Sequence, residues 1–400
     1  MFITILSSCK KPNLVPNPVP KELPPITVNS DCKGGNGFFC ISNIEFKTVD
    51  YNISDKRGWA YAYGAVAVSS GKIFFAGGHD EGNSLHNSTM DEVKIYTPLT
   101  GSQDLFDLSV ARSHLSGISV GNTVLFAGGN SSRGAYPLYS DNTSLEYFED
   151  VDIFSSTTPI TYQKAKLSQP RAYMAAVSCN NKAWFIGGRN ASNAGIQLNS
   201  TIQYSDRIDI FDPSANVWSQ LTLPRPRAYA GAVAVGNKIY IGGGKNDTGN
   251  LTIVDVYDVS SQRWTTLTAP NEHPYASVCL LNDQIFIAGG DGKLNKSVDI
   301  YDTQSGTWRY ANLSDSRFDM AVSVANNKIV YLGGNYSGAI DVYNDVTHIW
   351  SRSTIVVLSR FTDALITGMA SATLNNRFYI SGYLSNQGNA QILGMTTIDL

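Results

Sequence analysis

The chain has 400 residues, of which 42% are hydrophobic, and a formal net charge of -3, which is an ordinary composition for a globular protein. Its lysines and arginines do not gather into a basic cluster, and this excludes the electrostatic footprint that nucleic acid binding requires. The 35 glycines and many aromatic residues favour short strands and tight turns over helices. The composition indicates an all-β protein whose partner is not a polyanion.

Residues 1–9 form an apolar run that ends in Leu6-Ser7-Ser8-Cys9. This ending resembles the lipobox of bacterial lipoprotein signal peptides, and the resemblance implies lipidation of Cys9. The run is too short to span a bilayer and lacks a charged start, so a truncated signal segment and a chance match both fit. Residues 10–30 contain six prolines and predict an extended tether, with a plain disordered tail as the alternative. We therefore expect a lipid-anchored protein of the bacterial cell envelope, or alternatively a secreted one.

The folded domain is expected over residues 31–400. Near its start, Cys32 and Cys40 flank a Gly-rich stretch at residues 33–37 that would let them form a disulfide in an oxidising compartment. Cys179 and Cys279 lie in apolar strand patterns and are expected to be small buried side chains.

An apolar strand that ends in two glycines recurs along the domain. Its copies are KIFFAGG ending at Gly78, TVLFAGG at Gly129, KAWFIGG at Gly188, KIYIGGG at Gly244, QIFIAGG at Gly290, KIVYLGG at Gly334 and RFYISGY at Tyr383. The first glycines are 44 to 59 residues apart, which is about the length of one propeller blade. Because the apolar run does not alternate, it predicts a strand covered on both faces.

Other parts of the unit repeat at fixed positions. An arginine stands 16 residues before the first glycine in four units, a third strand such as VDIF or VDVY follows the diglycine, and a tryptophan opens a fourth strand. The tryptophans are Trp218, Trp264, Trp308 and Trp350. The five aspartates of the third strands recur once per unit, which predicts a structural role for Asp152, Asp209, Asp255, Asp299 and Asp341.

The order of diglycine, aromatic residue and tryptophan resembles the kelch-repeat family over nearly the whole chain from about residue 44. The resemblance implies a β-propeller of four-stranded blades. Counting diglycines predicts seven blades, with six as the alternative. Since the last unit has no fourth strand, residues 44–49 are expected to pair with its third strand and close the ring from the amino-terminal side.

In such a blade the loop before the first strand and the loop after the diglycine emerge at the same face. We expect this face to bind a ligand, because its loops at residues 79–92, 130–150 and 189–207 are long. Kelch relatives that bind peptides or sugars use this face, so a protein or glycan partner is expected.

Two interpretations of the four repeated arginines, Arg112, Arg171, Arg227 and Arg317, stay open. They form either a cationic ring that binds a carboxylate or a framework that satisfies loop carbonyls. His114, Tyr173 and Tyr229 follow two residues after three of these arginines, and Tyr275 follows two residues after His273, which replaces the arginine in its unit. They either line the ligand site or fill the channel.

Catalysis has weaker support in the sequence. The copper site of the galactose oxidase propellers, a distant resemblance, needs a His and Tyr set that this chain lacks, so no metal and no cofactor is expected. A distant resemblance to N-acetylneuraminate epimerase, a sialate mutarotase, makes Glu272 and His273 a candidate acid/base pair, with an exposed polar turn as the alternative. We therefore expect a monomeric, non-enzymatic binding module of the cell envelope, with a mutarotase-like isomerase as the alternative.

Overall fold

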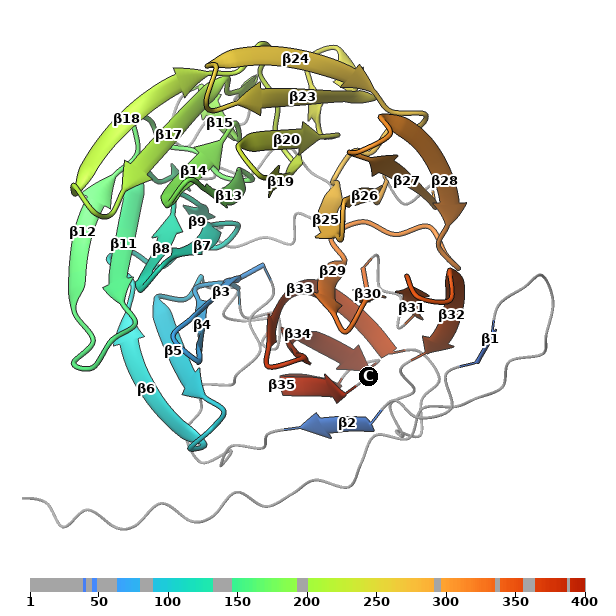
Figure 1. Cartoon of the computed structure of the whole chain (residues 1–400). Helices are drawn as coiled ribbons and strands as arrows, with labels where there is room; N and C mark the ends of the chain where they lie inside the picture. Colours follow the sequence, from blue (N-terminus) through green and yellow to red (C-terminus); the bar gives the residue numbers. More distant parts are fainter. Residues whose placement is uncertain are drawn as a thin grey trace, which may run out of the picture.

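The computed structural model of the chain describes residues 39–40, 45–48, 63–79, 89–131, 146–192, 201–290, 296–334, 339–354, 364–386 and 389–399. All regular secondary structure in these ranges is β, and they contain no helix of the length and apolarity needed to cross a membrane. Their strands form sheets arranged around a central axis (Figure 1).

Six successive blades share one plan, in which four antiparallel strands follow one another in order from the channel to the rim. Blade one contains β3 (Ala65–Ser69), β4 (Lys72–Ala76), β5 (Glu92–Thr97) and β6 (Ser102–Asp107). Blade two contains β7 (Ser116–Val120), β8 (Thr123–Ala127), β11 (Asp150–Ser155) and β12 (Tyr162–Lys166). Blade three contains β13 (Ala175–Cys179), β14 (Lys182–Ile186), β17 (Arg207–Asp212) and β18 (Val217–Thr222).

The second half of the ring continues this plan. Blade four contains β19 (Gly231–Val235), β20 (Lys238–Gly242), β23 (Ile253–Asp258) and β24 (Arg263–Thr268). Blade five contains β25 (Ser277–Leu281), β26 (Gln284–Ala288), β27 (Ser297–Asp302) and β28 (Thr307–Asn312). Blade six contains β29 (Ala321–Ala325), β30 (Lys328–Leu332), β31 (Ala339–Asn344) and β32 (Ile349–Thr354), beside which β1 (Phe39–Cys40) pairs in parallel.

A further sheet lies between blade six and blade one and differs from the others in its strand lengths. It consists of β33 (Ala364–Leu374), β34 (Arg377–Asn386), β35 (Asn389–Asp399) and β2 (Glu45–Thr48). Strand β33 contacts both β29 and β3, and β2 pairs antiparallel with β35, Glu45 opposite Asp399. The six regular blades match the alternative blade count, and this sheet closes the ring with the amino-terminal strand that the sequence predicted.

Three short hairpins extend the loops that follow the diglycines. They are β9 (Asn130–Ser131) with β10 (Glu146–Tyr147), β15 (Arg189–Ser192) with β16 (Thr201–Tyr204), and β21 (Lys245–Asn246) with β22 (Gly249–Asn250). Large parts of the long loops lie outside the described residues, and so do residues 1–38 with Cys9 and Cys32.

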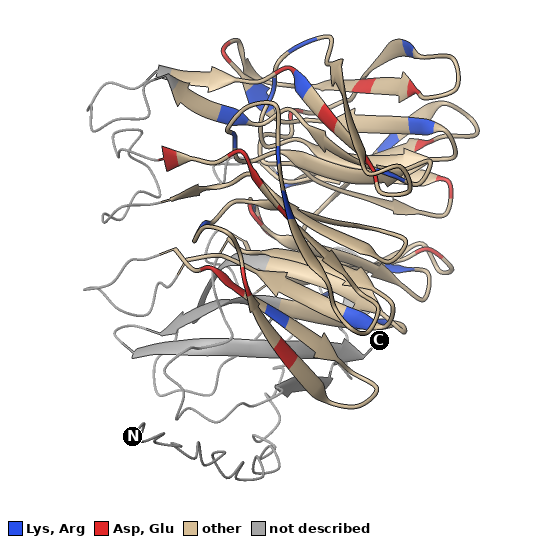
Figure 2. Ribbon diagram, turned by 90° about the vertical axis from the view of Figure 1, so that its left-hand side faces the viewer, with Lys and Arg blue, Asp and Glu red and all other residues tan. Residues whose placement is uncertain are grey.

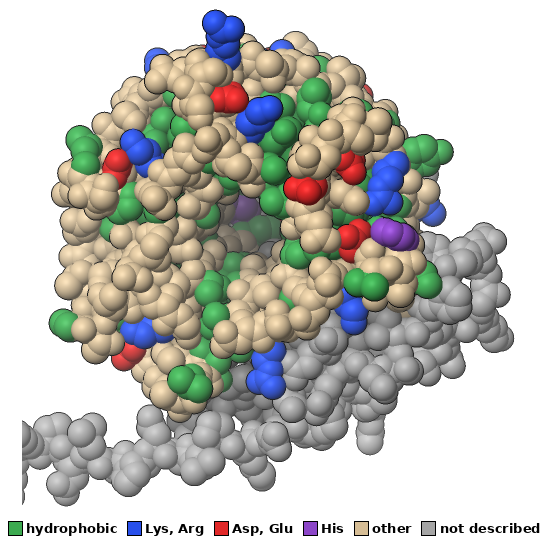
Figure 3. All heavy atoms as spheres, viewed as in Figure 1, with side chains coloured by type: hydrophobic (Ala, Val, Ile, Leu, Met, Phe, Trp, Pro, Cys, Tyr) green, Lys and Arg blue, Asp and Glu red, His purple; other side chains and the backbone are tan. Residues whose placement is uncertain are grey.

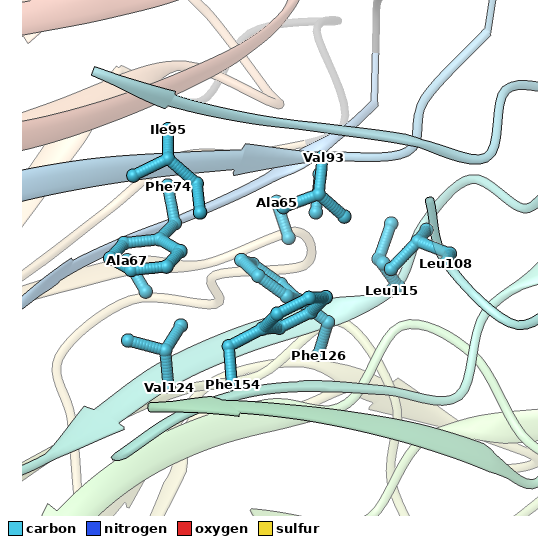
Figure 4. Close-up of a cluster of buried hydrophobic side chains, with 11 residues drawn as sticks. Ala65, Ala67, Phe74, Val93, Ile95, Leu108, Leu115, Val124, Phe126 and Phe154 are labelled. Carbon is cyan, nitrogen blue, oxygen red and sulfur yellow. The ribbon is translucent and has the colours of Figure 1, made fainter. Parts of the chain in front are cut away.

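The hydrophobic core lies between neighbouring blades. Four consecutive residues are buried in the second strand of every regular blade, as the non-alternating pattern predicted. Between blades one and two, Phe74 and Ile95 pack against Phe126 and Phe154 (Figure 4). Because the second and third strands of a blade are covered on both faces, their sequences are largely apolar runs and do not alternate regularly with polar residues. The fourth strands lie at the rim and are mostly exposed.

The diglycine forms a joint between successive blades. Gly128 has a φ of +62°, and a Cβ there would lie 2.3 Å from the carbonyl oxygen of Arg171 in the next blade. The amide of Gly129 donates to that same carbonyl at 3.0 Å. Only glycine permits both the positive φ and this close approach of the backbone.

The tryptophans pack across the strand pair at the rim. Trp218, Trp264, Trp308 and Trp350 are each the direct register partner of an aromatic residue of the third strand. Their ring centroids lie 4.8 to 5.1 Å from those partners, an arrangement worth about 0.5–1.5 kcal/mol beyond the area buried. In blade two, which has no tryptophan, Tyr162 takes this position opposite Phe154.

Candidate functional site

The four repeated arginines are buried and paired within their own blades. Each guanidinium is at most 1% exposed and contacts the aspartate of the third strand. The pairs are Arg112 with Asp152, Arg171 with Asp209, Arg227 with Asp255 and Arg317 with Asp341. These aspartates have the structural role that their repetition predicted.

In Arg112, every nitrogen of the guanidinium donates to a neighbour. Its Nη2 lies 2.5 Å from Oδ2 of Asp152, its Nε donates to the carbonyl of Gly128 at 2.7 Å, and its Nη1 donates to the carbonyl of Val110 at 3.0 Å. Asp152 also accepts from the backbone and hydroxyl of Ser109 in the loop that leaves blade one. The arginines therefore have no exposed face for a ligand carboxylate, and their geometry supports the framework interpretation over the cationic ring.

Burial lowers the pKa of Arg227 to about 10, against the opposing effect of Asp255. This guanidinium therefore stays charged at neutral pH, and the ion pair holds two real charges in the interior. A buried pair of this kind is costly to break from one side.

Glu272 and His273 do not form an acid/base pair. His273 is 1% exposed and takes the arginine's place in blade five, with Nδ1 3.0 Å from the carbonyl of Gly289 and Nε2 3.1 Å from Asp299. Glu272 is exposed and accepts from Asn250 at 3.2 Å. Because the histidine is used in the framework and the glutamate points to a neighbouring loop, the mutarotase hypothesis has no support in this geometry.

A second set of repeated positions lies at the mouth of the central channel, two residues before the first strand of each blade. Its aromatic side chains are partly exposed and form a continuous series. The successive ring centroids are 4.5 Å apart from Tyr63 to His114, 4.5 Å from His114 to Tyr173, 4.6 Å from Tyr173 to Tyr229, 4.5 Å from Tyr229 to Tyr275, and 5.6 Å from Tyr275 to Phe318. Phe318 lies one residue before the repeated position of blade six, and we call the five residues at the repeated positions together with Phe318 the channel-mouth array.

The backbone explains why these side chains meet. Tyr63, His114, Tyr173, Tyr229 and Tyr275 all have φ between 53° and 60°. This left-handed conformation turns the peptide groups around the ring, so that the amide of Tyr229 donates to the carbonyl of Tyr173 at 3.1 Å. The same link joins His114 to Tyr63 at 2.8 Å. A positive φ is uncommon for bulky residues, and here interblade hydrogen bonds hold it in place.

Two cations lie over the array. Arg189 and Lys245 each follow a diglycine directly. The guanidinium carbon of Arg189 lies 4.9 Å from the ring centroid of Tyr173, and Nζ of Lys245 lies 5.0 Å from that of Tyr275, to whose hydroxyl it donates at 3.1 Å. Both contacts are within the range of cation–π attraction. The wall formed by blades three, four and five is therefore aromatic and positive.

Three titratable groups of the array, on His114, Tyr173 and Tyr229, are neutral at physiological pH. Burial lowers the pKa of His114 to about 3, although a hydrogen bond to Asn130 opposes the shift. Burial raises the pKa of the Tyr173 and Tyr229 hydroxyls. The mouth therefore presents neutral hydroxyl and imidazole groups as hydrogen-bonding partners, beside two fixed positive charges.

Blade six places a carboxylate where the other regular blades place an aromatic residue. Asp319 has a φ of 52° and lies two residues before β29. Burial is the main cause of the raised pKa of Tyr173, in blade three, and the charge of Asp319 adds to it. Burial raises the pKa of Asp319 to about 6.

Figure 3 shows the molecule hollowed at the centre of the ring on the face that carries the turns between the first and second strands, which is the end opposite to the channel-mouth array. Around this centre the first strands of neighbouring blades contact one another. The outer side of the described blades carries positive and negative residues interspersed (Figure 2). The array itself combines partly exposed aromatic side chains with cationic and acidic groups.

Of the predicted site residues, His114, Tyr173, Tyr229 and Tyr275 lie together at the mouth, whereas the four arginines and His273 lie beneath it. Sequence reasoning missed Tyr63, Asp319, Arg189 and Lys245. The signal for the first two was their position two residues after the arginine or its equivalent, and for the last two their position directly after a diglycine.

Fold and site together define an all-β propeller of the kelch type with four-stranded blades and a channel mouth lined by aromatic side chains. The Kelch motif family matches residues 170–222, 226–271 and 273–312, which correspond to blades three, four and five. These matches, together with the similarity to two scruin proteins, support a kelch-repeat family for this chain.

The chain is similar to three proteins over part of its length. It is 27% identical to alpha-scruin of Limulus polyphemus over 157 residues, 39% of this chain and 16% of that protein. It is 29% identical to spermatocyte protein spe-26 of Caenorhabditis elegans over 176 residues, 38% of this chain and 30% of that protein. It is 28% identical to beta-scruin of Limulus polyphemus over 193 residues, 46% of this chain and 19% of that protein. The matches thus span less than a third of each relative.

Proposed function

We propose that this chain is a non-enzymatic binding module that engages a protein partner through the channel-mouth array and the loops around it. The observation that carries the proposal is the array itself, in which six aromatic residues from successive blades meet at the mouth with Arg189 and Lys245 over them. Partly exposed tyrosines and arginine are the residue types that most often dominate protein interfaces. The kelch matches favour a protein as the partner.

The framework supports this role by keeping the mouth rigid. The backbone of the array is held by hydrogen bonds between blades, and the buried Arg–Asp pairs fix the loops just beneath it. A site that is already ordered before binding loses little conformational entropy when the partner arrives.

Site-specific photo-crosslinking tests the proposal. A photoreactive phenylalanine analogue placed at Asn246, beside Lys245 on β21, should crosslink one partner, which mass spectrometry of the adduct then identifies. The same analogue at Asp283, in the turn at the opposite end of blade five, is the matched control. The charge-removing double variant Arg189→Gln/Lys245→Gln should abolish the crosslink from Asn246. An adduct that forms equally from Asp283, or survives the double variant, would contradict the proposal.

A glycan is the second candidate partner, and the partly exposed tyrosine faces of the array are the observation that favours it. Sugars present apolar C–H faces to aromatic rings and hydroxyls to polar groups. A glycan array probed with the wild type and with Tyr229→Ala tests it. Signals that do not depend on Tyr229 would argue against a sugar at the mouth.

We also propose that the protein resides in the bacterial cell envelope through a lipid on Cys9, because of the lipobox-like ending and the proline-rich segment after it. Mass spectrometry of the mature amino terminus tests this. An amino terminus without lipid would contradict the anchor and leave secretion as the alternative.

A further inference from the structure

Asp319 is the one charged residue at the repeated mouth positions of the six regular blades. The equivalent positions hold Tyr63, His114, Tyr173, Tyr229 and Tyr275. All six residues lie two positions before their first strand and have the same left-handed φ, so the backbone presents Asp319 to the channel as it presents the tyrosines.

The carboxylate of Asp319 has no hydrogen bond and no ion pair within the described part of the chain, whereas the five framework aspartates are all paired. Arg189 and Lys245 lie over the tyrosines of blades three to five. No described cation lowers the pKa of Asp319, which burial alone raises to about 6. At neutral pH this group is therefore an ionised carboxylate that is partly desolvated and uncompensated, an arrangement that costs stability.

Asp319 holds in blade six the backbone position that Tyr275 holds in blade five. Phe318 precedes it and packs against Tyr275 with ring centroids 5.6 Å apart. A carboxylate at a mouth lined with aromatic rings matches a guanidinium group, because the planar fork of the guanidinium donates two parallel hydrogen bonds to a carboxylate while its flat face stacks on a ring. A lysine ammonium would gain the charge but neither the bidentate geometry nor the stacking.

We propose that Asp319, Phe318 and Tyr275 form an acceptor site for an arginine side chain of the partner, which enters the channel mouth on the side of blade six. This inference rests on the proposed function, since it assigns one contact within the same mouth. The arginine supplies the positive charge that the carboxylate lacks, and the cationic wall on blades three to five is left to acidic or polar groups of the partner. The mouth would thereby select a partner segment that carries an arginine near blade six and an acidic group near blades three to five.

The probe for this test is N-acetyl-arginine amide, with N-acetyl-citrulline amide as the neutral compound of nearly identical shape. For a ligand of this size we expect a Kd on the order of 1 mM at pH 7.5, measured by ligand-observed NMR. Citrulline amide should bind about tenfold more weakly or not at all, because it cannot form the charge-assisted pair.

Two variants make the assignment specific. Asp319→Asn keeps the shape of the side chain, removes an uncompensated charge and is expected to fold; it should weaken arginine amide binding about tenfold or more. Asp283→Asn makes the same chemical change at an exposed position at the opposite end of blade five and should leave binding unchanged.

No saturable binding of arginine amide, equal binding of citrulline amide, or undiminished binding to Asp319→Asn would each overturn the inference. Its failure is distinguishable from failure of the proposed function. If arginine amide does not bind while Arg189→Gln/Lys245→Gln still abolishes the partner crosslink, the mouth remains the interface and only the arginine site is wrong.

Discussion

Replacing Arg112 by methionine separates the framework role of the arginines from a ligand-binding role. The change leaves Asp152 buried with its charge and removes four contacts of the guanidinium, to Asp152 and to the carbonyls of Val110, Phe126 and Gly128. Both side chains of the ion pair are 0% exposed. Breaking a buried pair from one side costs about 3–5 kcal/mol, whereas an exposed pair contributes about 0–1 kcal/mol.

The assay is urea unfolding followed by tryptophan fluorescence, for Arg112→Met, Asp152→Leu and the double variant. We expect each single change to lower the free energy of unfolding by about 3–5 kcal/mol. The double variant should lose at least about 2 kcal/mol less than the sum, because the second change removes the charge that the first left unpaired. A loss below about 1 kcal/mol for Arg112→Met, or additive losses, would refute the framework account.

Three further predictions concern the core and the channel mouth. Phe126→Ala, which empties space between blades one and two where Phe126 is 0% exposed, should cost about 3–5 kcal/mol in urea unfolding, and a loss near zero would mean that the interblade core is not packed as described. His114 has a folded pKa of about 3 against an ordinary value of 6.5, so below pH 6.5 the unfolded state binds more protons than the folded state. The free energy of unfolding therefore decreases as the pH is lowered, by about 1.4 kcal/mol per pH unit at most. His114→Tyr, which introduces the residue that the next three blades have at this position, should remove this contribution to the pH dependence of the free energy of unfolding. An unchanged pH dependence would contradict the lowered pKa of His114. Asp319 has a folded pKa of about 6 against 3.8, so its ionisation costs stability as pH rises from 4 to 6. Asp319→Asn should stabilise the protein at pH 7.5 by up to about 3 kcal/mol, with the gain vanishing near pH 4. A destabilised Asp319→Asn at pH 7.5 would indicate a favourable partner for the carboxylate.

The repeat made the fold predictable. The non-alternating strand before each diglycine correctly indicated burial on both faces, and the missing fourth strand of the last unit correctly indicated closure by residues 44–49. Both inferences depend on local periodicity and on the need to cover sheet edges, which sequence carries directly.

The site was less predictable, because the direction of a side chain depends on backbone conformation. Arg112 and His114 are only two residues apart, and alternation along a strand would point them the same way. The positive φ of His114 breaks that alternation, so the arginine is buried under the loop while the histidine faces the channel. Asp319 was missed for a related reason, since it shares the position of the tyrosines but not their chemistry.

The central claim is that the channel mouth is the interface, and the affinity of the crosslinked partner for two matched double variants tests it most directly. Arg189→Gln/Lys245→Gln removes two positive charges at the mouth, and Lys182→Gln/Arg263→Gln removes two from the turns at the opposite end of blades three and four. Titration calorimetry should show an affinity loss of about tenfold or more for the first variant and little change for the second. Equal losses would attribute the effect to overall charge, and a loss confined to the second variant would place the interface at the other end of the propeller.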